Sequence, residues 1–143
     1  MVKKSRGTKE YFAEVFTLES RIHRLYDKIE VLRSRQAYLG GGFGPGVQKS
    51  RDYTRTEGLS LDILELEDEV TKAKNSLLQL EREIKGVSGS LQDPMHRAII
   101  TWRYICRLKW KDISARAEMS EMQVMREHNA AIMQMEFADN IAG

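Results

Sequence analysis

Apolar residues recur at alternating intervals of four and three in two stretches of the chain, residues 9–39 and 59–87. A strand repeats every two residues, so this spacing predicts helices, and a narrow apolar seam between charged residues is typical of a coiled coil. At about 1.5 Å per residue, each helix would be roughly 45 Å long. The seams consist of Tyr11, Val15, Leu18, Ile22, Leu25, Ile29, Leu32 and Leu39, and of Leu59, Ile63, Leu66, Val70, Ala73, Leu77, Leu80, Ile84 and Val87, with the polar Gln36 at one seam position.

The segment 40–57 between the two seams is rich in glycine and contains Gly44-Pro45, which ends a helix. We therefore expect a flexible loop, and two helices of matched length joined by such a loop pack antiparallel. The loop matches neither GxGxxG after a strand nor GxxxxGKS/T, the two patterns of phosphate-binding loops. We interpret it as the mobile tip of a helical hairpin, with the alternative that a partner orders it through Phe43, Arg51, Tyr53 and Arg55.

Several large apolar residues of the predicted hairpin lie outside its seams and indicate a second contact surface. They are Phe12, Phe16, Tyr26, Leu64 and Leu78. One interpretation is that they dock onto the C-terminal part of the chain. We favour the other, a homodimer or higher oligomer in which two hairpins form a four-helix bundle or a longer coiled coil.

The second half of the chain begins with a short hinge, residues 85–93, and a strong helix start. Asp93 is an expected N-cap, and Pro94 occupies the first helical position, where its missing N–H costs nothing. The face of the following helix that we expect to be buried carries Met95, Ile99, Trp102 and Cys106.

A short helix, a tight turn and a longer helix follow. Residues 110–117 (WKDISARA) form the short helix, and Glu118-Met119 form the turn. Ser120 and Gln123 have the spacing of a capping box, in which each side chain satisfies the other residue's backbone N–H. The last helix should run to about residue 137 and bury Val124, Ala131 and Met135. This order of elements is the outline of a helix-turn-helix.

A family resemblance is carried by Asp93-Pro94, Trp102-Arg103-Tyr104-Ile105, Leu108-Lys109-Trp110, Asp112-Ile113, Ser120, Val124, Arg126, His128, Ala131 and Ile132. In this register, residues 91–132 resemble the C-terminal (region-four) helix-turn-helix of bacterial sigma factors. They are still more similar to phage transcription regulators of the RinA/ArpU type, which also begin with a helical or coiled-coil segment. The resemblance implies a DNA-binding protein whose last helix enters the major groove.

The sequence departs from the pattern of that family at three places. Glu118 stands where the family tends to have glycine, and a left-handed glutamate would cost about 1–2 kcal/mol. Glu127 stands where an apolar residue usually pins the last helix. The start of that helix, residues 121–123, carries Glu-Met-Gln instead of basic residues, so its one cation is Arg126. Since phosphate contacts supply most nonspecific affinity, one copy alone should bind DNA weakly.

The candidate DNA-binding residues fall into two groups. The first turns of the last helix would face base edges: Gln123 suits adenine, Arg126 suits guanine, and a methionine suits a thymine methyl. Four cations on the preceding helices would hold phosphates, with the alternative that they form a solvated face. The methionines could instead contact a partner protein. The predicted base-facing residues are Glu121, Met122, Gln123, Met125, Arg126 and Asn129, and the phosphate-facing residues are Arg103, Arg107, Lys109 and Lys111.

Composition narrows the classes of protein further. The chain has 143 residues, 23 Lys+Arg, 21 Asp+Glu and one Cys, so an intrachain disulfide is impossible and a reducing compartment is favoured. Residues 1–39 carry nine basic and five acidic side chains, whereas residues 91–143 carry seven of each. No apolar run approaches the roughly 18 residues of a membrane span, and the N-terminus lacks a signal-peptide pattern.

Residues with reactive side chains give no catalytic pattern. We interpret Cys106 as a small core residue and His128 as a helix-packing residue. His23 and His96 lack the neighbouring carboxylate and nucleophile that catalysis needs, and no second His or Cys stands at zinc-ligand spacing. We therefore expect neither an enzyme nor a cofactor nor a metal.

The sequence thus predicts an all-α protein with two parts. Residues 1–90 form a long antiparallel coiled-coil hairpin, with helices at about 9–39 and 59–87 and a flexible loop at 40–57. Residues 91–143 form a small helix-turn-helix domain. The predicted function is a sequence-specific transcription regulator, a phage-encoded activator in the cytoplasm of a bacterial host, with double-stranded DNA and RNA polymerase as partners. The alternatives are a module that docks on RNA polymerase without reading DNA and, third, a small terminase-like DNA-packaging subunit.

Overall fold

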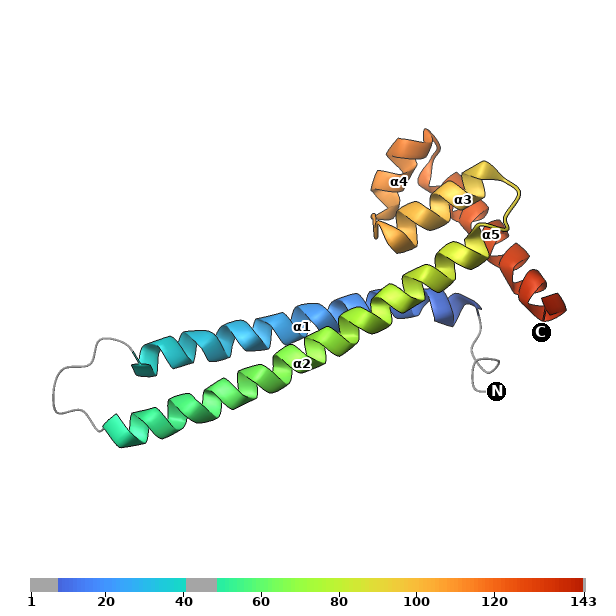
Figure 1. The fold of residues 1–143 in the computed structure, drawn as a ribbon. Helices are drawn as coiled ribbons and strands as arrows, with labels where there is room; N and C mark the ends of the chain where they lie inside the picture. The colour runs from blue at the N-terminus through green and yellow to red at the C-terminus, as the bar shows by residue number, and fades with distance from the viewer. Residues whose placement is uncertain (1–7, 41–48, 143) are drawn as a thin grey trace. The chain divides into compact units, whose positions relative to one another are not determined.

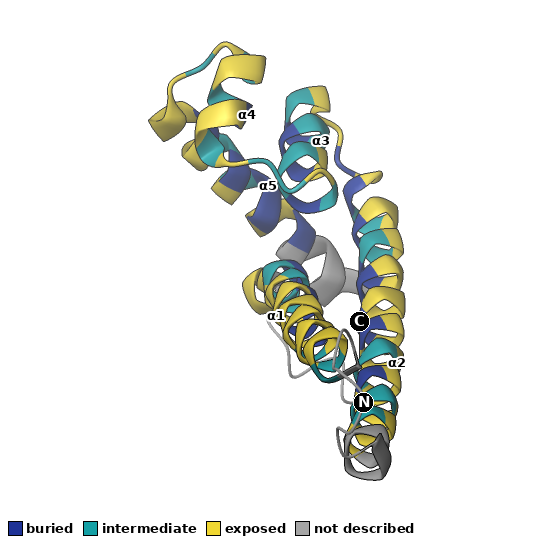
Figure 2. Cartoon of the chain, turned by 90° about the vertical axis from the view of Figure 1, so that its left-hand side faces the viewer, coloured by how far each residue is buried: buried dark blue, intermediate teal, exposed yellow. Residues whose placement is uncertain are grey.

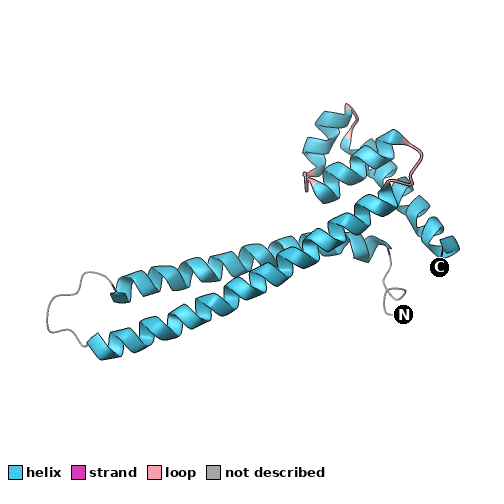
Figure 3. Ribbon diagram, in the orientation of Figure 1, coloured by secondary structure: helices cyan, strands magenta, loops and turns pink. Residues whose placement is uncertain are grey.

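The structure, a computed structural model, describes residues 8–40 and 49–142. In these ranges the regular elements are all helical, as the sequence predicted (Figure 3). Figure 1 labels the helices along the chain. They are α1 (Thr8–Gly40), α2 (Lys49–Ser88), α3 (Pro94–Ile100), a π-helical turn η2 (Thr101–Ile105), α4 (Trp110–Ala117) and α5 (Glu121–Ala142).

Contacts divide the chain into two compact units. The hairpin unit comprises residues 18–76, and the C-terminal unit joins residues 1–17 to residues 77–143. The C-terminal unit therefore includes the start of α1 and the end of α2 as well as the helices that follow. The sequence pattern had suggested a division near residue 90.

The hairpin unit is held by the predicted apolar seam. Leu25 and Ile29 of α1 pack with Ile63 and Val70 of α2, and all four are buried. Buried and exposed residues alternate along α2, as a one-sided seam requires (Figure 2).

Two polar contacts across the hairpin show its antiparallel direction. Arg33 Nη2 lies 2.7 Å from Glu67 Oε2, and Gln36 Nε2 lies 2.5 Å from Ser60 Oγ. The partner number on α2 falls as the number on α1 rises, which only antiparallel helices allow. The Gln36 amide also donates to the Thr56 carbonyl oxygen, so the one polar seam position is satisfied by α2.

The second helix begins at Lys49, earlier than the Leu59 that the seam suggested. Residues 49–57 of the predicted flexible loop are therefore helical, whereas residues 41–48 lie outside the described part of the chain. Residues 49–56 have ordinary helix propensity, and each residue added to an existing helix gains a hydrogen bond. Gly58 costs about 1 kcal/mol relative to alanine but does not end the helix. Periodicity of apolar residues misses such a polar extension.

Two off-seam aromatic residues of α1, Phe12 and Phe16, pack inside the C-terminal unit. Phe12 is 2% exposed, and its ring centroid lies 4.7 Å from that of Tyr104, while the Phe16 and Tyr104 centroids are 5.8 Å apart. For these two residues the structure shows docking onto the C-terminal helices. The other three off-seam residues are exposed: Tyr26 (43%), Leu64 (60%) and Leu78 (49%).

The C-terminal helices enclose a second apolar core. Ile99 of α3, Ile113 of α4 and Val124 of α5 are each 0% exposed and pack together. Their partly buried neighbours are Met95, Trp102, Leu108, Trp110, Ala117 and Met119. The predicted burial of Val124, Ala131 and Met135 is confirmed. This core fixes α4 and α5 with respect to α3, and so sets which side of α5 remains exposed.

Candidate nucleic-acid interface

The start of α3 has the predicted cap. Asp93 Oδ1 accepts from the Met95 backbone N–H at 2.9 Å, and Pro94 is the first helical residue. A carboxylate at this position satisfies an N–H that the helix cannot pair internally.

The start of α5 has the predicted capping box. The Gln123 backbone N–H donates to Ser120 Oγ at 3.1 Å, and the Ser120 backbone N–H donates to Gln123 Oε1 at 3.2 Å. The Gln123 side-chain oxygen therefore belongs to the cap. Its predicted contact with adenine would need that oxygen as an acceptor, so within this geometry Gln123 offers only its NH2 group to a base.

The turn between α4 and α5 contains the strained residue that the sequence predicted. Glu118 has φ 55° and ψ 42°, a left-handed conformation that favours glycine. The turn is held by Ser114, whose carbonyl oxygen accepts from the Glu118 and Met119 backbone N–H groups and whose hydroxyl donates to the Met119 carbonyl oxygen. These bonds explain how a side chain other than glycine is tolerated there.

All six predicted base-facing residues are exposed on α5. Met122 is 73% exposed and Met125 is 38% exposed, whereas Val124, Ala131 and Ile132 are 0% exposed. The structure thus separates a buried side of the helix from a surface that carries Glu121, Met122, Gln123, Met125, Arg126 and Asn129.

Asn129 contacts a buried pair of side chains. His128 Nδ1 lies 3.3 Å from Asn129 Oδ1, and His128 Nε2 lies 2.6 Å from the Tyr104 hydroxyl. Burial raises the pKa of Tyr104 to about 12, so its hydroxyl keeps its proton and can donate it to Nε2. Burial also lowers the pKa of His128, which favours the neutral ring with its proton on Nδ1, facing Asn129. The predicted packing role of His128 is confirmed by its contacts with Tyr104 and Trp110.

Of the four predicted phosphate-facing cations, Lys109 and Lys111 are exposed next to and within α4, but Arg103 is not available. The Arg103 guanidinium lies 4.5 Å from the Phe16 ring centroid and 4.3 Å from that of Trp110, and its Nη1 donates to the Leu108 carbonyl oxygen at 2.9 Å. Burial lowers the pKa of Arg103 below its usual value. We correct its assignment from a phosphate ligand to a packed cation that joins α1 to α4.

Arg107 is likewise engaged within the fold. Its Nη1 lies 2.7 Å from Glu81 Oε1 of α2, and its own backbone is left-handed, with φ 56°. The side chains of the pair are 27% and 16% exposed. An arginine held by a carboxylate is a poor phosphate ligand, so this assignment is also corrected. Sequence alone gave no signal of it, because the partner lies 26 residues earlier.

Glu127, the second departure from the family pattern, contacts a histidine instead of an apolar neighbour. Its Oε2 lies 2.7 Å from His96 Nε2, and the His96 side chain is only 7% exposed. This contact joins α5 to α3. The expectation that His96 has no neighbouring carboxylate is wrong, since Asp93 Oδ2 also lies 3.5 Å from Nε2.

Cys106 is exposed, contrary to the prediction that it is a core residue. The helix that contains Ile99 and Trp102 passes into the π-helical turn and ends at Cys106, whose N–H bonds to the Thr101 carbonyl oxygen. An i→i+5 bond takes one residue more per turn than an α-helix, so the face predicted from α-helical spacing does not continue to Cys106.

Within the described residues, no helix is long and apolar enough to cross a membrane. Comparisons with family models, with curated proteins and with solved structures found no match to this chain.

Proposed function

We propose that the chain is a sequence-specific DNA-binding transcription regulator, a phage-encoded activator that acts in the cytoplasm of a bacterial host. One observation carries this proposal: α5 begins at a capping box after a three-residue turn from α4 and presents an exposed polar surface over its first turns. A helix held in this way by a short preceding helix is the arrangement that enters the major groove in helix-turn-helix proteins. The resemblance to RinA/ArpU-type regulators and to sigma-factor region four supports the same function.

Two side chains of α5 are suited to read bases. Arg126 can donate two hydrogen bonds to guanine O6 and N7. Asn129 can donate through its NH2 group to an acceptor on a base edge, while its side-chain oxygen faces His128 Nδ1 at 3.3 Å. Both are exposed.

Electrostatic attraction to DNA comes from fewer cations than the sequence suggested. With Arg103 and Arg107 engaged inside the fold, the candidates near the groove are Lys109, Lys111 and Arg126. With Arg126 on guanine, Lys109 and Lys111 provide two phosphate contacts, which give a log–log salt slope of about −1.8 for one module and about −3.6 for two. We therefore propose that a homodimer or higher oligomer, formed through exposed apolar residues of the hairpin, brings two modules to one site.

The second candidate function is docking on RNA polymerase without base reading. It is favoured by the exposed methionines Met122 (73%) and Met133 (67%), because methionine suits adaptable protein interfaces. The equal numbers of acidic and basic residues in 91–143 favour it as well.

The test is selection of bound duplexes from a random library by the full-length protein. We expect the wild type to enrich an inverted repeat. Arg126→Ala should lose about 1–3 kcal/mol of binding free energy on that site and the preference at one base position, whereas Lys111→Ala should bind all sequences more weakly. No enriched motif together with an affinity that ignores salt would reject DNA reading. Co-purification with core RNA polymerase would then support docking, with Met122→Ser as the variant that should weaken it.

A further inference from the structure

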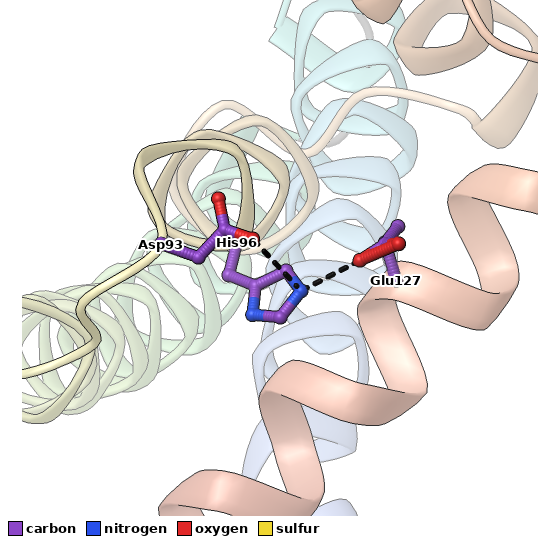
Figure 4. Close-up of side chains that lie close together, drawn as sticks. All are labelled: Asp93, His96 and Glu127. Carbon is purple, nitrogen blue, oxygen red and sulfur yellow. Dashed lines mark hydrogen bonds and ion pairs between the residues drawn. The ribbon is translucent and has the colours of Figure 1, made fainter.

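Three potential metal ligands converge where α3 begins beside α5. Figure 4 shows the His96 ring between the carboxylates of Asp93 and Glu127, with its Nε2 atom facing both. The Nε2 atom lies 2.7 Å from Glu127 Oε2 and 3.5 Å from Asp93 Oδ2, and one ligand atom from each residue lies within 4.8 Å of the other two.

The separations are close to those that a first-row metal ion imposes on its ligands. Zinc binds histidine nitrogen and carboxylate oxygen at about 2.0–2.2 Å, so two neighbouring ligand atoms lie roughly 3.0–3.5 Å apart. The Glu127 oxygen needs to move away from Nε2 by only a few tenths of an ångström, and the Asp93 oxygen already lies at the upper limit. Both carboxylate side chains are partly exposed, at 38% and 48%, so they can make this adjustment and leave space for water ligands.

We propose that Asp93, His96 and Glu127 bind a divalent transition-metal ion such as Zn²⁺. Two carboxylates and one neutral imidazole balance the ion's charge, and the imidazole favours zinc, nickel or copper over magnesium and calcium. Two of the ligands are already oriented: the His96 side chain is 7% exposed, and Asp93 Oδ1 accepts from the Met95 N–H, which leaves Oδ2 on the side of His96.

Metal binding competes with a proton in this cluster. The His96 Nδ1 atom is buried and has no hydrogen-bond partner among the described residues, so the neutral ring is best served by a proton on Nε2, donated to Glu127. A metal at Nε2 moves that proton to Nδ1, where it lacks the acceptor that metal-bound histidines usually have. The site therefore binds zinc more weakly than a closed four-ligand site.

The bound ion would replace one hydrogen bond between α3 and α5 with three coordinate bonds. It would thus stabilise the unit that contains the helix-turn-helix, since a ligand that binds only the folded state raises its stability. The experiment is thermal unfolding of the full-length protein after chelator treatment, followed by tryptophan fluorescence, with increasing Zn²⁺ and in parallel with Mg²⁺. We expect Zn²⁺, but not Mg²⁺, to raise the melting temperature to a plateau, and Co²⁺ to develop visible absorption bands.

Glu127→Gln is the informative variant, because the glutamine side chain can still accept the His96 hydrogen bond but is a far weaker metal ligand. We expect its zinc affinity, from calorimetric titration, to fall at least tenfold, while Glu121→Gln on the exposed surface of α5 and Cys106→Ser bind as the wild type does. The proposal is overturned if Zn²⁺ leaves the melting temperature unchanged. It is also overturned if Glu127→Gln and His96→Gln bind as tightly as the wild type, or if Cys106→Ser alone abolishes binding.

Discussion

Replacing Arg103 with lysine tests whether this residue is a packed cation or a phosphate ligand. Lysine keeps the charge, so a residue whose role is to attract phosphate would tolerate the change. The structure assigns Arg103 a different role: its planar guanidinium lies between the rings of Phe16 and Trp110 and donates to the Leu108 carbonyl oxygen. Lysine cannot reproduce a flat contact with two rings at once.

The size of the effect follows from those contacts. A cation–π contact contributes about 0.5–1 kcal/mol when exposed and about 2 when desolvated, so each of the two partly buried contacts contributes roughly 1 kcal/mol. A hydrogen bond from a charged donor contributes about 1.5–3 kcal/mol. Lysine retains one ring contact and loses the other together with the aligned hydrogen bond. Its flexible stem lets the ammonium group stay partly hydrated, which offsets part of this loss. We expect Arg103→Lys to lower the free energy of unfolding by about 2 kcal/mol.

Urea unfolding followed by tryptophan fluorescence is the assay. Both tryptophans of the chain, Trp102 and Trp110, pack in the C-terminal core, so the signal reports on the unit that contains Arg103. With a slope of about 2 kcal/mol per molar urea, the midpoint should fall by roughly 1 M. Arg116→Lys, an exposed position of α4, is the matched control and should stay within about 0.5 kcal/mol of the wild type. An unchanged urea midpoint for Arg103→Lys would refute the structural role. The same conclusion would follow if folded Arg103→Ala protein showed a salt slope of DNA binding smaller by about 0.9, the value of one phosphate contact.

Four further predictions address the cap, the turn, a buried histidine and the hairpin. Ser120→Ala should cost about 1 kcal/mol in urea unfolding, because the Gln123 backbone N–H loses its acceptor, Ser120 Oγ; a loss below the experimental error would contradict that geometry. Glu118→Gly should raise stability by about 1 kcal/mol, since glycine adopts the left-handed conformation without strain; a lower melting temperature would count against it. Burial lowers the pKa of His128 below its ordinary 6.5, so the unfolded state binds more protons than the folded state at acidic pH. The contribution of His128 to stability is therefore complete above about pH 6.5 and is lost as the pH falls below it. His128→Gln should flatten that part of the stability–pH curve, and an unaltered curve would show that another group titrates. Leu25→Asp places a charge in the buried hairpin seam and should lower the free energy of unfolding by several kcal/mol. The variant should be a monomer in analytical ultracentrifugation. A wild-type protein that is itself monomeric at tens of micromolar would reject oligomerisation through the hairpin.

The elements that the sequence predicted well are those controlled by local rules. Alternating spacing of apolar residues identified both long helices, and it named Leu25 and Val70 correctly as buried. The two caps, at Asp93 and Ser120, were predicted because a side chain needs only two or three residues of spacing to reach a helix N-terminus. The left-handed Glu118 was expected on different grounds, from the glycine that stands at this position in the proteins that the sequence resembles.

The roles that the sequence misassigned depend on partners far away in the chain. Arg103 looked like a surface cation because its aromatic neighbour Phe16 lies on another helix. His96 looked isolated because Glu127 comes 31 residues later. Spacing within one helix carries no information on such contacts. The six predicted base-facing residues are exposed on α5, as the spacing within that one helix indicated.

The glutamine in the hairpin seam has a consequence for alignment of the two long helices. A purely apolar seam with a seven-residue repeat would pack almost as well after one helix slides by one repeat, because leucine and isoleucine contacts are interchangeable. In the observed alignment the Gln36 amide donates to Ser60 Oγ and to the Thr56 carbonyl oxygen. After a slide, that amide would be enclosed without these acceptors, at a cost of about 1–3 kcal/mol. Gln36 thus selects one register among several of similar apolar content, and Gln36→Leu should yield a hairpin that is no less stable but samples more than one alignment.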